Sequence, residues 1–223
     1  WKANGSGGAN TDGSINSTVS ANTTAGFSIV TYAGTGSNAT VGHGLGVAPS
    51  VIILKNRDTA KNWIVYSRND ATDFLELNTT DATTDNVAAW NDTAPTSSVF
   101  TVGTSQAVNN SGDDLVAYVF AEVEGFSKFG TYEGNGSSAG PFINTGFRPA
   151  FVMLKNADSS YGWNILDNKR NPENVMNHPL YPDLSNAEGT STANVVDFYS
   201  NGFKLKGTGN GTNKNNDTYL YMA

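Results

Sequence analysis

Short apolar and aromatic runs, separated by small polar residues, dominate the chain and predict β-strands. Val51–Leu54 is a four-residue apolar run of the kind that a strand in a sandwich core shows. Residues 62–67 and 115–121 are rich in β-branched and aromatic side chains, and residues 151–154 and 219–222 repeat this pattern. No window of twelve or more residues holds a convincing apolar stripe at helical spacing. These patterns predict an all-β fold.

Turn signals lie between the predicted strands at regular distances. They include Gly44-Leu45-Gly46, Asn110-Ser111-Gly112-Asp113, Asn135-Gly136 and Asn201-Gly202. Several short strands per roughly one hundred residues, with turns of this kind, are typical of a β-sandwich or a jelly roll. The pattern does not choose between the two.

An internal duplication organises the sequence. Of the 35 positions in residues 32–66, 12 are identical to those in residues 132–166. The match continues in three further pairs of segments: Gly26–Ser28 with Gly125–Ser127, Val99–Val102 with Gly202–Leu205, and Asp114–Tyr118 with Asp217–Tyr221. A repeat of this length indicates two tandem copies of one unit. We therefore predict two β-sandwich or jelly-roll-like units, residues 26–124 and 125–223.

Residues 1–25 differ in composition from both copies. Twenty of the 24 residues from 2 to 25 are Gly, Ser, Thr, Asn or Ala, and such a composition cannot bury a core. We predict a linker here, or the end of a preceding unit that includes Trp1. We also expect that both ends of the sequence are cuts in a longer polypeptide.

Composition and charge exclude several classes of function. The 223 residues carry 13 Lys and Arg against 20 Asp and Glu, a net charge of −7, whereas a nucleic-acid binder needs a basic surface. There is no cysteine, so disulfides and thiol nucleophiles are excluded. No apolar run approaches the ~20 residues of a membrane helix, so we expect no membrane insertion. Residues 26–124 hold four basic and eleven acidic side chains, while residues 125–223 hold eight of each.

Histidine chemistry has weak support. His43 lies in a glycine-rich turn that we expect to be exposed, and the second copy has Ile143-Asn144 there. His178 lies in a loop that only the second copy contains. Neither has a recognisable nucleophile and acid beside it in the sequence.

Carboxylate and metal chemistry are equally weak. Asp73 with Glu76, and Asp113 with Asp114, could act as carboxylate pairs, although by residue type only. Residues 109–114 offer ligands that suit calcium, but no EF-hand spacing is present. We therefore predict no enzyme activity, no cofactor and no metal site.

One polar and aromatic group occurs in both copies, the pattern Lys-Asn-x-Asp followed by a tryptophan. An aromatic ring beside an amide and a carboxylate can hold a sugar, with the ring against its C–H face and the polar groups on its hydroxyls. The same residues could instead form a turn with the tryptophan in the core. The candidate glycan-binding residues are Asn56, Asp58, Trp63, Asn156, Asp158 and Trp163. Lys55 and Lys155 precede them in the two copies.

Several segments together resemble a known repeated domain. They are Gly26–Tyr32, Val41–Pro49 and Val51–Arg57, with Phe120–Gly130 and Gly146–Val152 at the junction and in the second copy. This pattern resembles a domain of unknown function that is repeated in tail-fibre-like virion proteins of tailed bacteriophages, especially marine ones. The resemblance extends over residues 1–223 and supplies no catalytic motif.

The resemblance implies a non-enzymatic virion structural module of a phage tail fibre or similar appendage, on the virion surface and outside the cell. It would serve in assembly and in contact with the bacterial cell envelope. The expected partners are other virion proteins, copies of itself and a host surface glycan. Two alternatives stay open: a purely structural capsid-decoration or spacer module, and a polysaccharide-degrading tail enzyme.

Overall fold

The computed structural model describes residues 1–68 and 70–223, and it confirms the all-β prediction. The chain divides into two compact units. The first unit comprises Trp1–Leu77 and Thr83–Val123, and the second comprises Asn78–Ala82 and Glu124–Ala223. The main division therefore falls between Val123 and Glu124, one residue before the boundary expected from the repeat.

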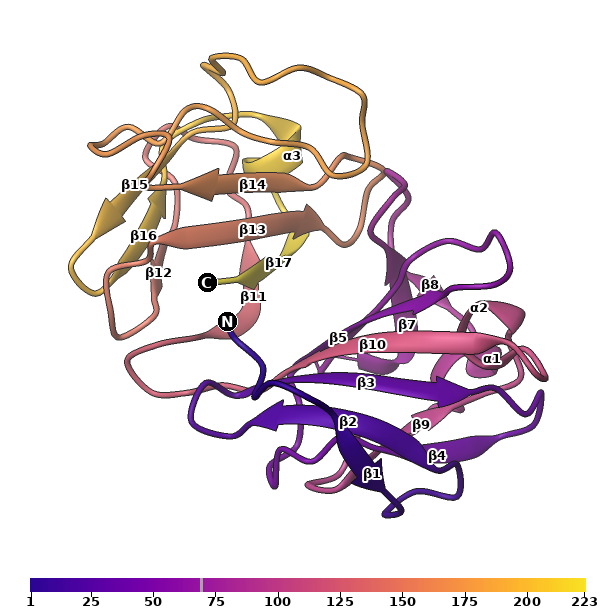
Figure 1. Ribbon diagram of the computed structural model, residues 1–223. Coiled ribbons are helices and arrows are strands. Elements are labelled where there is room, and N and C mark those ends of the chain that lie inside the picture. Colours follow the sequence, from indigo (N-terminus) through magenta and orange to yellow (C-terminus); the bar gives the residue numbers. More distant parts are fainter. Residues whose placement is uncertain (69) are drawn as a thin grey trace. The chain divides into compact units, whose positions relative to one another are not determined.

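The first unit contains ten strands and two short helices among its described residues (Figure 1). They are β1 (Gly8–Asn10), β2 (Ser17–Asn22), β3 (Phe27–Ala33), β4 (Ala39–Gly42), β5 (Val51–Asn56), β6 (Ile64–Ser67), β7 (Asp70–Glu76), β8 (Thr84–Asp85), α1 (Val87–Trp90), β9 (Val99–Val102), α2 (Gln106–Asn109) and β10 (Asp114–Phe120). Eight strands form one sheet in the order β1-β2-β3-β10-β5-β6-β7-β8, and β4 pairs with β9 in a second, smaller sheet. The sheets are antiparallel.

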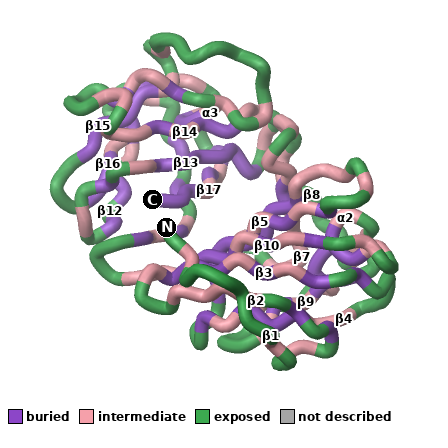
Figure 2. The backbone as a smooth tube through the Cα atoms, viewed as in Figure 1, coloured by how far each residue is buried: buried purple, intermediate pink, exposed green. Residues whose placement is uncertain are grey.

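The core of the first unit lies between its two sheets. In β10, Leu115, Ala117 and Val119 are fully buried, which follows from the two-residue period of a strand. They belong to one apolar cluster with Val41 of β4 and Phe100 of β9. Two antiparallel sheets that enclose a shared core give the unit a sandwich-like character. Figure 2 shows the buried positions along these strands.

Residues 1–25 belong to the first unit, so the prediction of a linker is wrong for this segment. β2 pairs with β3 along its whole length, from Ser17 opposite Tyr32 to Asn22 opposite Phe27. Ile15 is 7% exposed and joins the core cluster. The segment needs few apolar residues because it forms the edge of a sheet. Backbone hydrogen bonds between β2 and β3 hold it in place.

The second unit contains seven strands and one short helix. They are β11 (Phe129–Glu133), β12 (Phe142–Asn144), β13 (Phe151–Asn156), β14 (Asn164–Asp167), β15 (Val196–Tyr199), β16 (Gly202–Leu205), α3 (Asn210–Asn213) and β17 (Thr218–Met222). One sheet has the order β11-β17-β13-β14, and the other has the order β12-β16-β15. Both are antiparallel.

The second unit has its own core between these two sheets. Leu154 of β13 and Tyr219 of β17 come from the four-stranded sheet, and Phe198 and Phe203 come from the three-stranded sheet. All four are at most 1% exposed. The long connection from β14 to β15 adds the fully buried Met176, which bridges to Val196.

The helices of the described residues have four residues each. None of them has the length or the apolar character of a membrane-crossing helix.

Candidate functional site

In the first unit, the candidate residue Asn56 forms the centre of a turn. It is the last residue of β5 and is 1% exposed. Its side-chain oxygen accepts hydrogen bonds from the backbone N–H groups of Asp58 (3.0 Å) and Thr59 (2.9 Å). Its amide nitrogen donates to the carboxylate of Asp113 (2.8 Å) and to the carbonyl of Gln106 (3.0 Å). The amide therefore has its hydrogen bonds within the unit.

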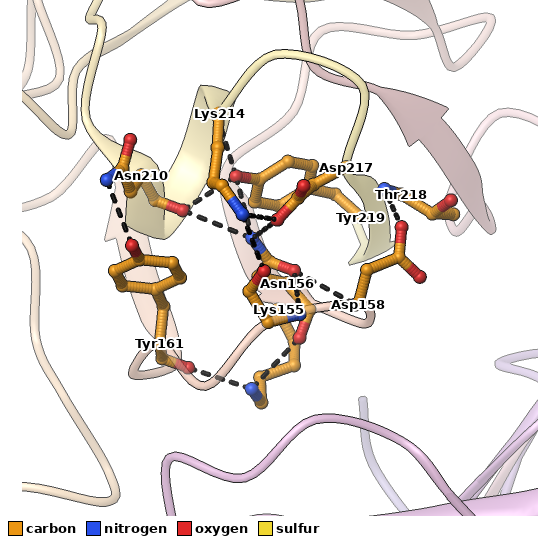
Figure 3. A network of polar contacts seen from close by, with 10 residues as sticks. Lys155, Asn156, Asp158, Tyr161, Asn210, Lys214, Asp217, Thr218 and Tyr219 are labelled. Atoms are coloured by element: carbon orange, nitrogen blue, oxygen red, sulfur yellow. Dashed lines mark hydrogen bonds and ion pairs between the residues drawn. The ribbon is translucent and has the colours of Figure 1, made fainter.

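Asn156 makes the corresponding contacts in the second unit (Figure 3). Its oxygen accepts from the N–H groups of Asp158 (3.0 Å) and Ser159 (2.8 Å). Its nitrogen donates to the carboxylate of Asp217 (2.9 Å) and to the hydroxyl of Tyr219 (3.0 Å). Asn156 is fully buried, so a ligand in solvent does not reach it.

Asp58 and Asp158 are exposed residues, and their carboxylates bind backbone N–H groups. Asp58 Oδ2 accepts from the N–H of Asp114 at 2.6 Å, and Asp158 Oδ2 accepts from the N–H of Thr218 at 2.6 Å. Each carboxylate joins the turn after one strand to the start of a neighbouring strand.

The same hydrogen bonds recur at a third place in the two units. Tyr32 donates its hydroxyl proton to the carbonyl of Val108, and Tyr132 donates to the carbonyl of Thr212, both at 2.6 Å. The amide of Asn109 donates to the carbonyl of Gly103 at 2.9 Å. In the second unit, Asn213 donates to Gly207 at the same distance. These bonds fix α2 and α3 to their units.

Asp113 and Asp217, which accept from the amides of Asn56 and Asn156, are favoured in their charged form. Hydrogen bonds from Thr59, Asn56 and Asn110 lower the pKa of Asp113 below its ordinary value. For Asp217, burial raises the pKa, but hydrogen bonds from Ser159, Asn156 and Lys214 outweigh this effect and lower it. Lys214 Nζ also forms an ion pair with Asp217 at 3.0 Å. Both networks therefore favour charged, structural aspartates.

The two lysines of the repeated pattern bind carbonyl groups. Lys155 is fully buried, and its Nζ donates to the carbonyls of Tyr161 (2.8 Å), Asn156 (2.9 Å) and Thr80 (3.2 Å). Its burial lowers its pKa to about 8. Lys55 Nζ donates to the carbonyl of Lys61 at 2.7 Å.

The two tryptophans differ in exposure. Trp163 is 3% exposed, and its backbone N–H donates to Asp183 at 3.1 Å. Trp63 is partly buried and stacks on Tyr118 of β10, with ring centroids 6.3 Å apart and an angle of 24° between the rings. In each copy, the amide and the carboxylate that precede the tryptophan in the sequence already form hydrogen bonds within the unit.

The structure therefore favours the turn-and-core interpretation over the sugar-site hypothesis for Asn56, Asp58, Trp63, Asn156, Asp158 and Trp163. The amides hold turns, the carboxylates hold strand starts, and the rings pack against the units.

His43 is buried, so the expectation of an exposed turn is wrong. Its Nδ1 accepts from the N–H of Leu45 at 3.2 Å, and its Nε2 lies 3.2 Å from the carbonyl of Thr96. Burial lowers the pKa of His43, which favours a neutral ring. His178 Nε2 lies 3.2 Å from the hydroxyl of Thr190. Its Nδ1 lies 3.8 Å from Glu188 Oε1, so the ring of His178 lies between a hydroxyl and a carboxylate, but both of these partners are exposed residues of a loop.

The carboxylate pairs considered for catalysis do not point to the same place. Asp73 and Glu76 are three residues apart in β7, so their side chains lie on opposite faces of the sheet. Glu76 accepts from the amide of Asn62 at 2.6 Å. Asp113 is bound within its turn, while Asp114 begins β10 and is exposed. Across residues 1–68 and 70–223, no group of three or more His, Asp or Glu side chains could hold a metal ion.

A cavity of about 410 Å³ lies over β1, β2 and β3 of the first unit. Its walls include Thr18, Thr31, Arg57 and Asp114, and its only ring is that of the buried Tyr32. It contains none of the six candidate residues.

Sequence reasoning missed Asp113 and Asp217 as the acceptors at the centre of the two networks. A usable signal was present, because each follows a polar turn, Asn110-Ser111-Gly112 or Lys214-Asn215-Asn216. Gly112 and Asn216 both have positive φ, 82° and 63°, and their N–H groups donate to the carbonyls of Gly34 and Gly134, so the two turns correspond.

Comparison with known proteins places the chain in one family. Residues 1–223 match the family model described as a domain of unknown function, DUF7483, so the chain belongs to that family. Searches of curated proteins and of solved structures gave no match.

Proposed function

We propose that this member of the DUF7483 family is a non-enzymatic structural module of a virion, part of a phage tail fibre or similar appendage. It serves in assembly of the particle and in contact with the bacterial cell envelope. The virion setting rests on the resemblance of segments such as Gly26–Tyr32 and Val51–Arg57 to tail-fibre-like proteins.

The proposal that the module is not an enzyme is supported by the hydrogen bonds that the repeated Asn and Asp side chains form within each unit. In both units, Asn and Asp side chains that could perform chemistry are bound to backbone N–H groups and to partner side chains. A network of this kind stabilises turns, which gives these side chains a structural role.

The proposed partners are other virion proteins, copies of the same chain and a host surface glycan, and the proposed location is the virion surface. Two β units without cysteine suit this setting, because their stability does not depend on the redox conditions outside a cell.

Immunogold electron microscopy of the intact particle tests the location. Antibodies raised against this chain should label a tail appendage. Label on the capsid surface would instead favour a capsid-decoration module, and absence of label from intact and disrupted particles would overturn the virion assignment.

A further inference from the structure

The outer face of the three-stranded sheet in the second unit carries side chains that its fold does not bury. Ile143, Phe203, Val196 and Phe198 point into the core from β12, β16 and β15. Alternation along each strand places their neighbours on the opposite face. The outer face therefore presents Phe142, Asn144, Lys204, Asp197 and Tyr199, with Gly202 among them.

The register of the strands arranges these residues in two rows. Lys204 lies between Phe142 and Asp197 in one row, and Gly202 lies between Asn144 and Tyr199 in the other. We call these six residues the outer patch. It combines two rings, an amide, an ammonium group and a carboxylate.

The two rings of the outer patch contact each other and remain open to solvent. Phe142 is 45% exposed and Tyr199 is 41% exposed, with centroids 5.9 Å apart and an angle of 71° between the rings. A Cβ on Gly202 would lie 2.9 Å from the ring of Phe142, so this glycine lets the ring lie close to the sheet. Covering a glycine explains Phe142 in part, but it does not explain the exposure of both rings.

Asp197 gives a second, independent indication of a ligand. It is 9% exposed, and its Oδ1 has no hydrogen-bond partner among the described residues. Its Oδ2 accepts from the hydroxyl of Tyr199 at 3.4 Å and lies 3.9 Å from Lys206 Nζ. A buried carboxylate oxygen without a partner is costly, and a donor from a ligand would remove that cost.

The corresponding strands of the first unit lack this surface. There, β4 pairs with β9, and Thr40 lies opposite Thr101 where the second unit has Phe142 opposite Lys204. The two units share their turn networks, so the rings are not a requirement of those networks.

The size of the outer patch favours a small ligand over a protein. The strands have three to four residues, and three strands span about 10 Å at the usual spacing, so the face measures on the order of 100 Å². A stable protein interface buries about 800 Å² on each partner.

We propose that the outer patch binds carbohydrate. The C–H face of a pyranose ring packs against Tyr199 and Phe142, because the negative face of an aromatic ring attracts polarised C–H groups. Hydroxyl groups of the sugar accept from the ammonium of Lys204 and the amide of Asn144. They donate to the carboxylate of Asp197, whose side chain is 13% exposed, unlike that of the fully buried Asn156. This site deepens the proposed function and rests on it, since it supplies the contact with an envelope glycan.

The test uses an array of purified O-antigen and capsular polysaccharides with the labelled chain. The variants are Tyr199→Ala and Phe142→Ala, and the control is Phe126→Ala, which removes another ring that is 48% exposed. The wild-type chain should bind at least one polysaccharide, and each patch variant should weaken the Kd by about tenfold or more. The control should stay within about twofold of the wild type.

Circular dichroism and thermal unfolding of each variant separate lost binding from lost folding. Phe142→Ala uncovers Gly202, so Tyr199→Ala is the decisive variant if Phe142→Ala unfolds. Binding that Tyr199→Ala leaves unchanged would overturn the outer patch as the site and leave the proposed function intact. No binding of any polysaccharide by the wild type would overturn the carbohydrate proposal, while immunogold labelling would still decide the virion assignment.

Discussion

Asn156 shows how a single buried amide can organise a turn. Its oxygen receives two backbone N–H groups, and its nitrogen reaches a carboxylate and a hydroxyl. Because each of these partners would lose its hydrogen bond to Asn156, we expect Asn156→Ala to lower the free energy of unfolding by about 1–3 kcal/mol. Urea unfolding followed by circular dichroism measures this. A stability equal to that of the wild type would contradict the structural role.

The lowered pKa of Asp113 predicts how stability depends on pH. A carboxyl group whose pKa is lower in the folded state stabilises the fold fully above its ordinary pKa, and this contribution disappears as the pH falls through the lowered value. Asp113→Asn should therefore make the loss of stability below about pH 4 shallower. Urea midpoints between about pH 7 and pH 2 test it.

Asp114→Asn is the matched control for this experiment, because Asp114 is the neighbouring carboxylate and accepts none of the bonds from Thr59, Asn56 or Asn110. A control that changes the acid slope as much as Asp113→Asn would show that the effect comes from general charge rather than from the turn network.

The two tryptophans should respond differently to truncation. Trp163 is 3% exposed, so Trp163→Ala should cost about 3–5 kcal/mol of stability. Trp63 is partly buried and stacks on Tyr118, so Trp63→Ala should cost less. Chemical unfolding of both variants provides the comparison. The reverse order would mean that Trp63 is the core residue.

At the residue scale, the sequence identified the repeated Asn and Asp but not their partners. Asn56 and Asp113 are far apart in the chain, and only the pairing of β5 with β10 brings them together. A sequence pattern cannot show that two polar side chains are hydrogen-bonded to each other. The Lys-Asn-x-Asp pattern therefore could not distinguish a sugar site from a turn.

At the scale of elements, β1 and β2 were the main omission. Their residues are mostly small and polar. Such residues can form the edge of a sheet because the backbone bonds of β1 to β2, and of β2 to β3, do not depend on side-chain type. Ile15 in the core cluster and Val19, which packs against it, were the apolar residues that could have indicated burial.

Ile15→Ala tests whether this segment is part of the fold. The side chain is 7% exposed and lies in the core cluster, so its loss should cost about 2–5 kcal/mol. Val47→Ala removes a valine that is 53% exposed and serves as the control. If Ile15→Ala unfolds at the same urea concentration as the wild type, the segment does not contribute to the core.

The sequence alignment of the last strands of the two units is shifted by one residue. The identities suggested that Asp114 corresponds to Asp217, but Asn56 binds Asp113 where Asn156 binds Asp217. The offset rises from 103 to 104 between Val102 and Gly103, since Lys206 is an extra residue after β16. Two adjacent aspartates made the wrong register look correct.

At the scale of the whole molecule, the class of fold could be predicted because strand periodicity and turns recur throughout. The sequence did not indicate the outer patch, because Phe142 and Tyr199 are 57 residues apart and meet only through the pairing of β12, β16 and β15. The repeat drew attention to what both units share, whereas Phe142 and Tyr199 have no aromatic counterparts in the alignment of the two units.

We propose that the chain binds the bacterial envelope and does not cleave its polysaccharides. The most direct measurement incubates the chain with host cells and with purified envelope polysaccharide, and it records binding and new reducing ends in the same tube. We expect saturable binding with no increase in reducing ends. New reducing ends would contradict it and would identify the chain as a polysaccharide-degrading enzyme.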